Sequence, residues 1–109
     1  MKITQNSTDT TLTLILDGEL DASSSVLLDN ELSKPEILRN QKILVDCRQL
    51  NYISSAGLGV FISHLQTFQD ANVKLVFFNM QEKVHNVFEI LGLDSLMTIV
   101  PSSAEAEAA

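Results

Sequence analysis

Residues 46–60 read DCRQLNYISSAGLGV and connect a short apolar run to an amphipathic segment. The apolar run lies within the residues from Lys42 to Cys47 and contains ILV, which is typical of a strand buried on both faces of a parallel sheet. After Ser55, apolar residues recur at the spacing of an amphipathic helix with one face turned to the core. These residues are Leu58, Phe61, Ile62, Leu65 and Phe68.

The N-terminal third of the chain predicts two strands and a helix. Alternation and β-branched residues indicate a strand over residues 11–17 and a weaker one over residues 2–5, with Gly18 interpreted as a breaker. The side-chain oxygens of residues 21–25 can cap a helix that runs to about Ser33. Residues 35–41 then form a connection.

The C-terminal half predicts a strand, a helix and a last strand. Val73 to Phe78 is an apolar strand, and Asn79 followed by Glu82 has the form of a capping box. Gly92 is placed to end the helix in the left-handed conformation, and residues 96–100 form the last strand. The apolar stripe of this helix consists of Val84, Val87, Phe88 and Leu91.

The order of these elements predicts an α/β domain with a mixed sheet of about five strands packed with three main helices. A length of 109 residues suits a single core, which we assign to residues 1–101. Residues 102–109 are predicted to form a flexible tail, because they offer little apolar surface to offset the entropy of ordering.

The charge and the single cysteine exclude several classes of function. The net charge of −7 disfavours nucleic acid and anionic membranes as partners. The start of the chain has no apolar signal region and no apolar run reaches about 18 residues, so we expect a cytoplasmic protein. Cys47 stands alone, which rules out an internal disulfide and favours a buried thiol.

Ser54 and Ser55 are predicted to lie at the start of the central helix. A helix N-terminus has unpaired N–H groups and about half a positive charge, so a serine can cap it and a phosphate is stabilised there. No Asp, Glu, Lys or Arg occurs from Ser54 to Gln69, and the predicted outer face carries Gly59, Ser63 and Gln66.

The two glycines of this helix each cost about 1 kcal/mol relative to alanine, so a compensating contact is expected. Close approach of another backbone, from within the domain or from a partner, would provide one. Alternatively, Gly57 and Gly59 only relieve crowding against a neighbouring strand.

The chain resembles the STAS domain family over nearly its whole length, and in particular the free-standing bacterial anti-sigma factor antagonists. The resemblance rests on four features in order. These are GELD at 18–21, an apolar strand that ends at Asp46, SSAGLGV at 54–60, and KVHNVFEILGL at 83–93.

The resemblance implies a protein that binds an anti-sigma factor, itself an ATP-dependent serine kinase, and that is released when Ser55 is phosphorylated. A serine phosphatase would reverse the reaction. Many members carry Asp before the phosphorylated serine, whereas this chain has Ser54, which is a minor alternative site. Asp21 matches a loop acid beside the site and Asp46 a supporting acid. The implied partner-binding residues are Asp21, Ser54, Ser55, Ala56, Gly57, Gly59 and Ser63.

Two alternative functions differ in what the sequence supports. An enzyme is disfavoured, because the chain has no Gly-x-Ser-x-Gly motif and no motif places His64 or His85 as a base. No cofactor or metal is expected. The second alternative keeps the fold and makes the chain an accessory or docking subunit of a transporter or a stress-signalling assembly without a sigma-factor output.

Overall fold

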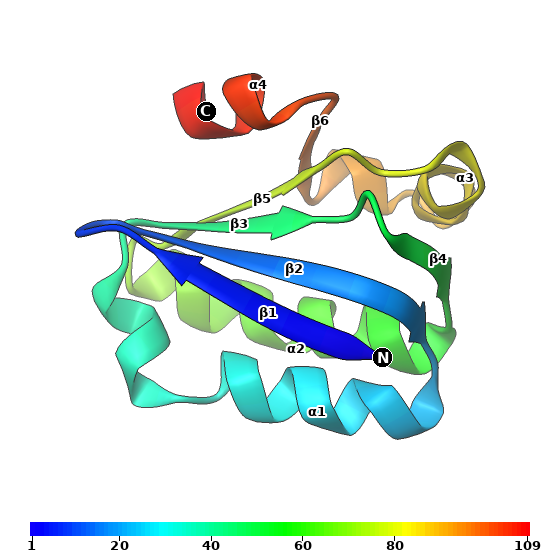
Figure 1. Cartoon of the computed structure of the whole chain (residues 1–109), viewed down its shortest axis with the longest axis horizontal. Helices are drawn as coiled ribbons and strands as arrows, with labels where there is room; N and C mark the ends of the chain where they lie inside the picture. The colour runs from blue at the N-terminus through cyan, green and yellow to red at the C-terminus, as the bar shows by residue number, and fades with distance from the viewer.

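The computed structural model describes all 109 residues as one α/β domain (Figure 1). The strands are β1 (Lys2–Ser7), β2 (Thr11–Leu20), β3 (Lys42–Asp46), β4 (Leu50–Ile53), β5 (Lys74–Phe78) and β6 (Thr98–Val100). The helices are α1 (Ala22–Leu32), α2 (Ser55–Asp70), α3 (Glu82–Ile90) and α4 (Ser103–Ala108), with 3-10 helices η1 (Pro35–Arg39) and η2 (Leu93–Ser95).

The sheet is mixed, as predicted, and runs in the order β1-β2-β3-β5-β6, with β4 paired to the end of β2. The β1–β2 pair is antiparallel and every other pair is parallel. Strand β4 was not predicted. Only its two end residues, Leu50 and Ile53, are buried, so its four residues carry neither alternation nor an apolar run.

The interpretation of Gly18 as a breaker was wrong. Strand β2 continues through it to Leu20, pairing first with β3 and then with β4. The register shifts between Gly18 and Glu19, and Gly18 has a φ of +113°, a conformation that other residues rarely adopt. The glycine therefore lets one strand change partners at a bulge.

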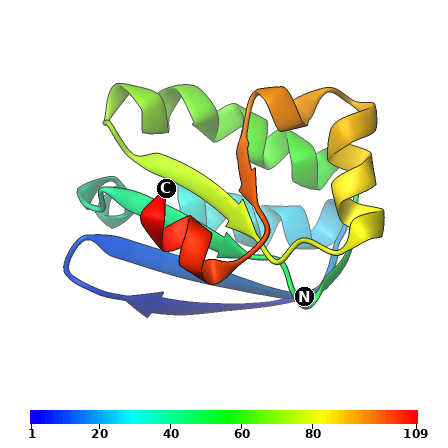
Figure 2. The same ribbon diagram turned by 90° about the horizontal axis from the view of Figure 1, so that it is seen from above.

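Helices α1 and α2 cover one face of the sheet, while α4 lies on the other face and α3 lies beside β4 (Figures 1 and 2). The main core is centred on four aromatic rings with no more than 1% exposure, Phe61, Phe68, Phe77 and Phe88. Phe61 packs edge-on against Phe77, with ring centres 4.8 Å apart. No helix of the protein has the length and apolar character needed to cross a membrane.

Cys47 is fully buried in this core, as predicted. Burial, and to a smaller extent the charge of Asp46, raises the pKa of the Cys47 thiol far above its ordinary value. The thiol is therefore neutral and acts as a small apolar side chain.

Three details of the predicted helices were wrong. Ile62 is 44% exposed, and Leu91 is 57% exposed because α3 ends at Ile90 and Leu91 is its C-cap. Asn79 does not cap α3. It adopts a left-handed φ of +57°, and the N-cap residue is Gln81, which lacks a side-chain cap bond. The left-handed conformation of Gly92 is confirmed by its φ of +71°.

The predicted connection at residues 35–41 includes η1, and the segment predicted to be a flexible tail contains α4. Ala106 of α4 is fully buried in a second apolar cluster on the far face of the sheet, with Leu44, Val76 and Phe78. The mobility of this segment in solution stays a prediction.

Candidate functional site

Strands β2 and β4 bring the starts of α1 and α2 together. Leu20, the last residue of β2, pairs with Ile53, the last residue of β4. The next residues, Asp21 and Ser54, are the N-caps of α1 and α2. Both helices therefore begin at the same edge of the domain and run in the same direction (Figure 1).

Asp21 caps α1 through a closed set of hydrogen bonds. Its Oδ1 accepts from the Ser24 N–H at 2.9 Å and from the Ser24 and Ser23 hydroxyls at 2.9 and 3.0 Å. The Asp21 N–H in turn donates to Ser24 Oγ at 2.9 Å, which completes a capping box. The bond from the Ser24 N–H, followed by those from the two hydroxyls, lowers the pKa of Asp21 from 3.8 to about 2.

The Asp21→Asn variant should lose part of the acid sensitivity of folding. Because the pKa of Asp21 is lower in the folded state, its ionised form stabilises the fold above about pH 4, and this contribution disappears as the pH falls towards 2. Asparagine also caps helices but does not titrate. Thermal midpoints measured from pH 6 to pH 2 should fall less steeply for the variant, and equal slopes would rule out this role.

Ser54 and Ser55 lie side by side but have different environments. Ser54 is half-buried, and its Oγ accepts from the Gly57 N–H at 3.1 Å while its own N–H donates to the Leu20 carbonyl at 2.9 Å. Ser55 is the first residue of α2 and is exposed, and its hydroxyl takes part in none of the side-chain hydrogen bonds of the structure. Ser54 therefore has a structural task, whereas the hydroxyl of Ser55 is free.

Replacing Ser54 by alanine should destabilise the protein by about 0.5–2 kcal/mol, because the cap of α2 is lost. Ser54→Asp is the matched control, since aspartate is also a good N-cap and should keep most of the stability. Urea unfolding followed by circular dichroism measures both. A Ser54→Ala variant as stable as the parent would contradict the capping role.

The exposed face next to Ser55 is small and uncharged. Ala56, Gly59 and Ser63 are all exposed, and the Ser63 hydroxyl donates to the Val60 carbonyl at 2.7 Å. With Ser55, these residues form a surface that we name the α2 face. A partner can cover it without burying a charged side chain.

The structure assigns different roles to Gly57 and Gly59, which the sequence could place either against a neighbouring strand or against a partner. A Cβ atom on Gly57 would lie 2.6 Å from Leu20 Cγ and 3.2 Å from the Leu20 carbonyl oxygen, so Gly57 permits close packing of α2 on β2. A Cβ atom on Gly59 would have nothing within 4 Å. Gly57 is therefore buried inside the domain, and only Gly59 is accessible to a partner.

The remaining sequence candidates lie outside this face. Asp46 is half-buried at the end of β3, and its Oδ1 accepts from the Arg48 N–H at 3.0 Å, which stabilises the turn. His64 Nε2 lies 2.8 Å from Asp29 Oδ1 and joins α2 to α1. Sequence reasoning missed this contact, because its partners are 35 residues apart.

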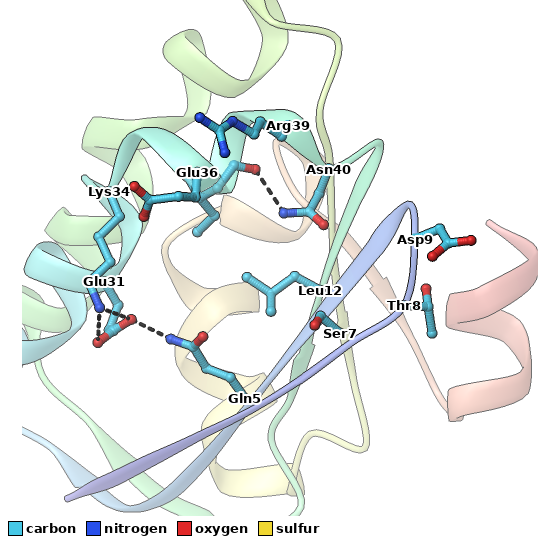
Figure 3. Close-up of a pocket in the computed structure, with 11 residues that line it drawn as sticks. Gln5, Ser7, Thr8, Asp9, Leu12, Glu31, Lys34, Glu36, Arg39 and Asn40 are labelled. Carbon is cyan, nitrogen blue, oxygen red and sulfur yellow. Dashed lines mark hydrogen bonds and ion pairs between the residues drawn. The ribbon is translucent and has the colours of Figure 1, made fainter.

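A separate cleft of about 290 Å³ lies at the opposite end of the sheet, beside the turn between β1 and β2 (Figure 3). Glu31 is paired with Lys34 at 3.0 Å and also accepts from Gln5, while Arg39 and Asp9 lie farther along the rim. This cleft is therefore a different surface from the α2 face, because it carries charges of both signs and lies far from the start of α2.

Comparison with known proteins agrees with this geometry. The sequence model of the STAS domain matches residues 2–106. The protein BtrV of Bordetella bronchiseptica, named as an anti-sigma factor antagonist, is 30% identical over 109 residues, which cover 100% of this chain and 94% of that protein.

Solved structures share the fold. A Thermotoga maritima protein that is named as an anti-sigma factor antagonist superposes with a TM-score of 0.85 at 22% identity, covering 97% of this chain and 92% of that one. The antagonist SpoIIAA in its unphosphorylated form gives a TM-score of 0.74 at 17% identity, covering 95% and 92%. The Bacillus SpoIIAA in its phosphorylated form also gives 0.74, at 20% identity, covering 98% and 97%. From the family match over nearly all of its length, the chain belongs to the STAS domain family.

Proposed function

We propose that this protein is an anti-sigma factor antagonist that binds an anti-sigma factor with serine kinase activity and is released when Ser55 is phosphorylated. One observation carries the proposal: the Ser55 hydroxyl is exposed and unbonded at the start of α2, within an uncharged face. It is a binding protein rather than an enzyme, and a cytoplasmic location is part of the proposal because the partner consumes ATP.

Charge and desolvation explain how the modification acts as a switch. A phosphoryl group adds about −1.5 to −2 charges at neutral pH. A partner that covers the α2 face would have to bury this group, which is costly when it is unpaired. The N-terminus of α2 stabilises the phosphate by about 0.3–1 kcal/mol, so the fold tolerates it while the interface does not.

The environments of the two serines favour Ser55 over Ser54 as the modified residue. The Ser54 oxygen already caps α2, so phosphorylation there would disturb the helix start. Phosphorylation of Ser55 leaves that bond in place. We assign partner contacts to the α2 face and to Asp21, which lies at the same edge, and a supporting role to Asp46 through its turn.

The names of similar proteins support the proposal. BtrV is named as an anti-sigma factor antagonist, and SpoIIAA has been solved in unphosphorylated and phosphorylated forms with the same fold as this chain. We propose by analogy that a serine phosphatase regenerates the binding form.

The proposal is tested by mixing the purified protein with an anti-sigma factor of the serine kinase class from the same organism and following the complex by gel filtration. We expect a stable complex without ATP and dissociation when ATP is added. A complex that forms equally with and without hydrolysable ATP, while the protein becomes phosphorylated, would overturn the switch. Absence of any complex would overturn the antagonist function itself.

A further inference from the structure

The C-terminal helix α4 covers a second apolar surface on the face of the sheet opposite α1 and α2 (Figure 1). Leu44, Val76 and Phe78 on β3 and β5 are no more than 4% exposed, and Ala106 of α4 packs against them with no exposure at all. Without α4, these three side chains would face solvent. Apart from α4, the side chains that pack against this cluster are the partly buried Val100 at the end of β6 and Ala109 at the end of the chain.

Few contacts hold α4 in place. It has six residues, and a helix of this length has little stability alone. The free-energy cost of nucleating the helix exceeds the gain from the few hydrogen bonds that it forms. Its only buried side chain is the small Ala106. The rest of its sequence is alanine, serine and glutamate, which bury little apolar surface.

Lys42 provides the fastening at the end of α4. Its Nζ donates to the carbonyl oxygens of Ala106 and Glu107, at 3.3 and 2.6 Å. These carbonyls are in the last turn, where the Ala109 N–H also donates to the Ala106 carbonyl at 3.3 Å and the helix dipole favours a cation. At the other end, Ser102 Oγ accepts from the Glu105 N–H at 3.4 Å, a long bond.

We propose that α4 is a detachable strap, fastened by Lys42, that opens while the sheet stays folded and exposes the surface of Leu44, Val76 and Phe78. Because α4 has little intrinsic stability and makes a small contact, the free energy needed to open it is well below the free energy of global unfolding. Pro101, which follows β6 directly and precedes the N-cap Ser102, has no N–H to bond to the sheet and marks the hinge. The strap lies on the face of the sheet away from α2, so its opening does not require release of a partner from the α2 face.

The test uses two alanines of the same helix as a matched pair. In Ala106→Asp, a carboxylate would have to be buried against the sheet, which α4 avoids by opening. In Ala104→Asp, the same change falls on an exposed position of α4. Amide hydrogen exchange measures α4 and the strands β3 and β5 in each full-length variant, and binding of the dye 8-anilinonaphthalene-1-sulfonate reports exposed apolar surface.

We expect α4 amides of the parent to exchange at least about tenfold faster than those of β3 and β5, yet slower than in an unfolded chain. Ala106→Asp should bring α4 to the unfolded rate and raise dye fluorescence, with β3 and β5 still protected, whereas Ala104→Asp should match the parent. Lys42→Met should speed exchange in α4, and Lys74→Met, on the neighbouring strand, should not.

Three results would overturn the proposal. Exchange of α4 at the same rate as β3 and β5 would mean that it opens only with the whole domain. Loss of sheet protection in Ala106→Asp would make α4 an integral part of the core. Unprotected α4 amides in the parent would mean that no fastened state exists.

Discussion

The Ser55→Asp and Ser55→Glu variants should bind the proposed kinase partner about 100-fold or more weakly than the parent. The carboxylate places a charge at the start of α2, inside a face without charged side chains. Burying an uncompensated charge costs about 3–5 kcal/mol, which corresponds to at least two orders of magnitude in affinity. Ser55→Ala removes the proposed acceptor of the phosphate and should therefore keep its affinity when ATP is present.

Isothermal titration calorimetry of these variants with the kinase gives the affinities directly. Ser103→Asp is the control for net charge, because Ser103 is exposed on α4, on the far face of the sheet. It should bind like the parent. The interface assignment fails if Ser55→Asp binds as tightly as Ser103→Asp, or if Ser55→Ala is released by ATP.

The two glycines of α2 should respond oppositely to alanine. Gly57→Ala should destabilise the fold by about 1–3 kcal/mol, because its Cβ overlaps Leu20, whose carbonyl also accepts the Ser54 N–H. Gly59→Ala should stabilise the fold by about 0.5–1 kcal/mol, because the new methyl meets no atom and alanine favours the helix.

Urea unfolding of the two variants at one pH measures this difference. The substitution and the helix are the same in both, so helix propensity cancels and the packing against β2 remains. Equal changes in unfolding free energy, of either sign, would show that Leu20 moves aside without cost and that α2 does not depend on close approach at Gly57.

The central helix α2 and the buried strand β3 were predictable, because the helix has a long apolar periodicity and the strand a continuous apolar run. Capping at the start of α2 was also predictable from the oxygen of Ser54. Features that depend on a partner strand were not. At Gly18, strand β2 changes its pairing partner to β4, and at Asn79 the chain makes a left-handed turn directly after β5. Neither feature produces a periodic pattern in the sequence.

The candidate site was predictable only in outline. The absence of charge from Ser54 to Gln69 and the family resemblance both pointed to Ser55. Sequence could not separate Gly57 from Gly59, because the distinction depends on Leu20, which is distant in the chain. The sequence also could not show that Ser54 is less accessible than Ser55. The lower exposure of Ser54 depends on the pairing of β4 with β2, which places the Ser54 N–H against the Leu20 carbonyl.

The most direct measurement adds ATP to the protein and the proposed kinase partner and follows two quantities in one time course. Mass spectrometry with site localisation follows phosphate on Ser55, and gel filtration follows the surviving complex. The two curves should mirror each other, with one phosphate per chain, on Ser55. A complex that persists after Ser55 is fully phosphorylated, or a phosphate that accumulates on another residue, would contradict the account.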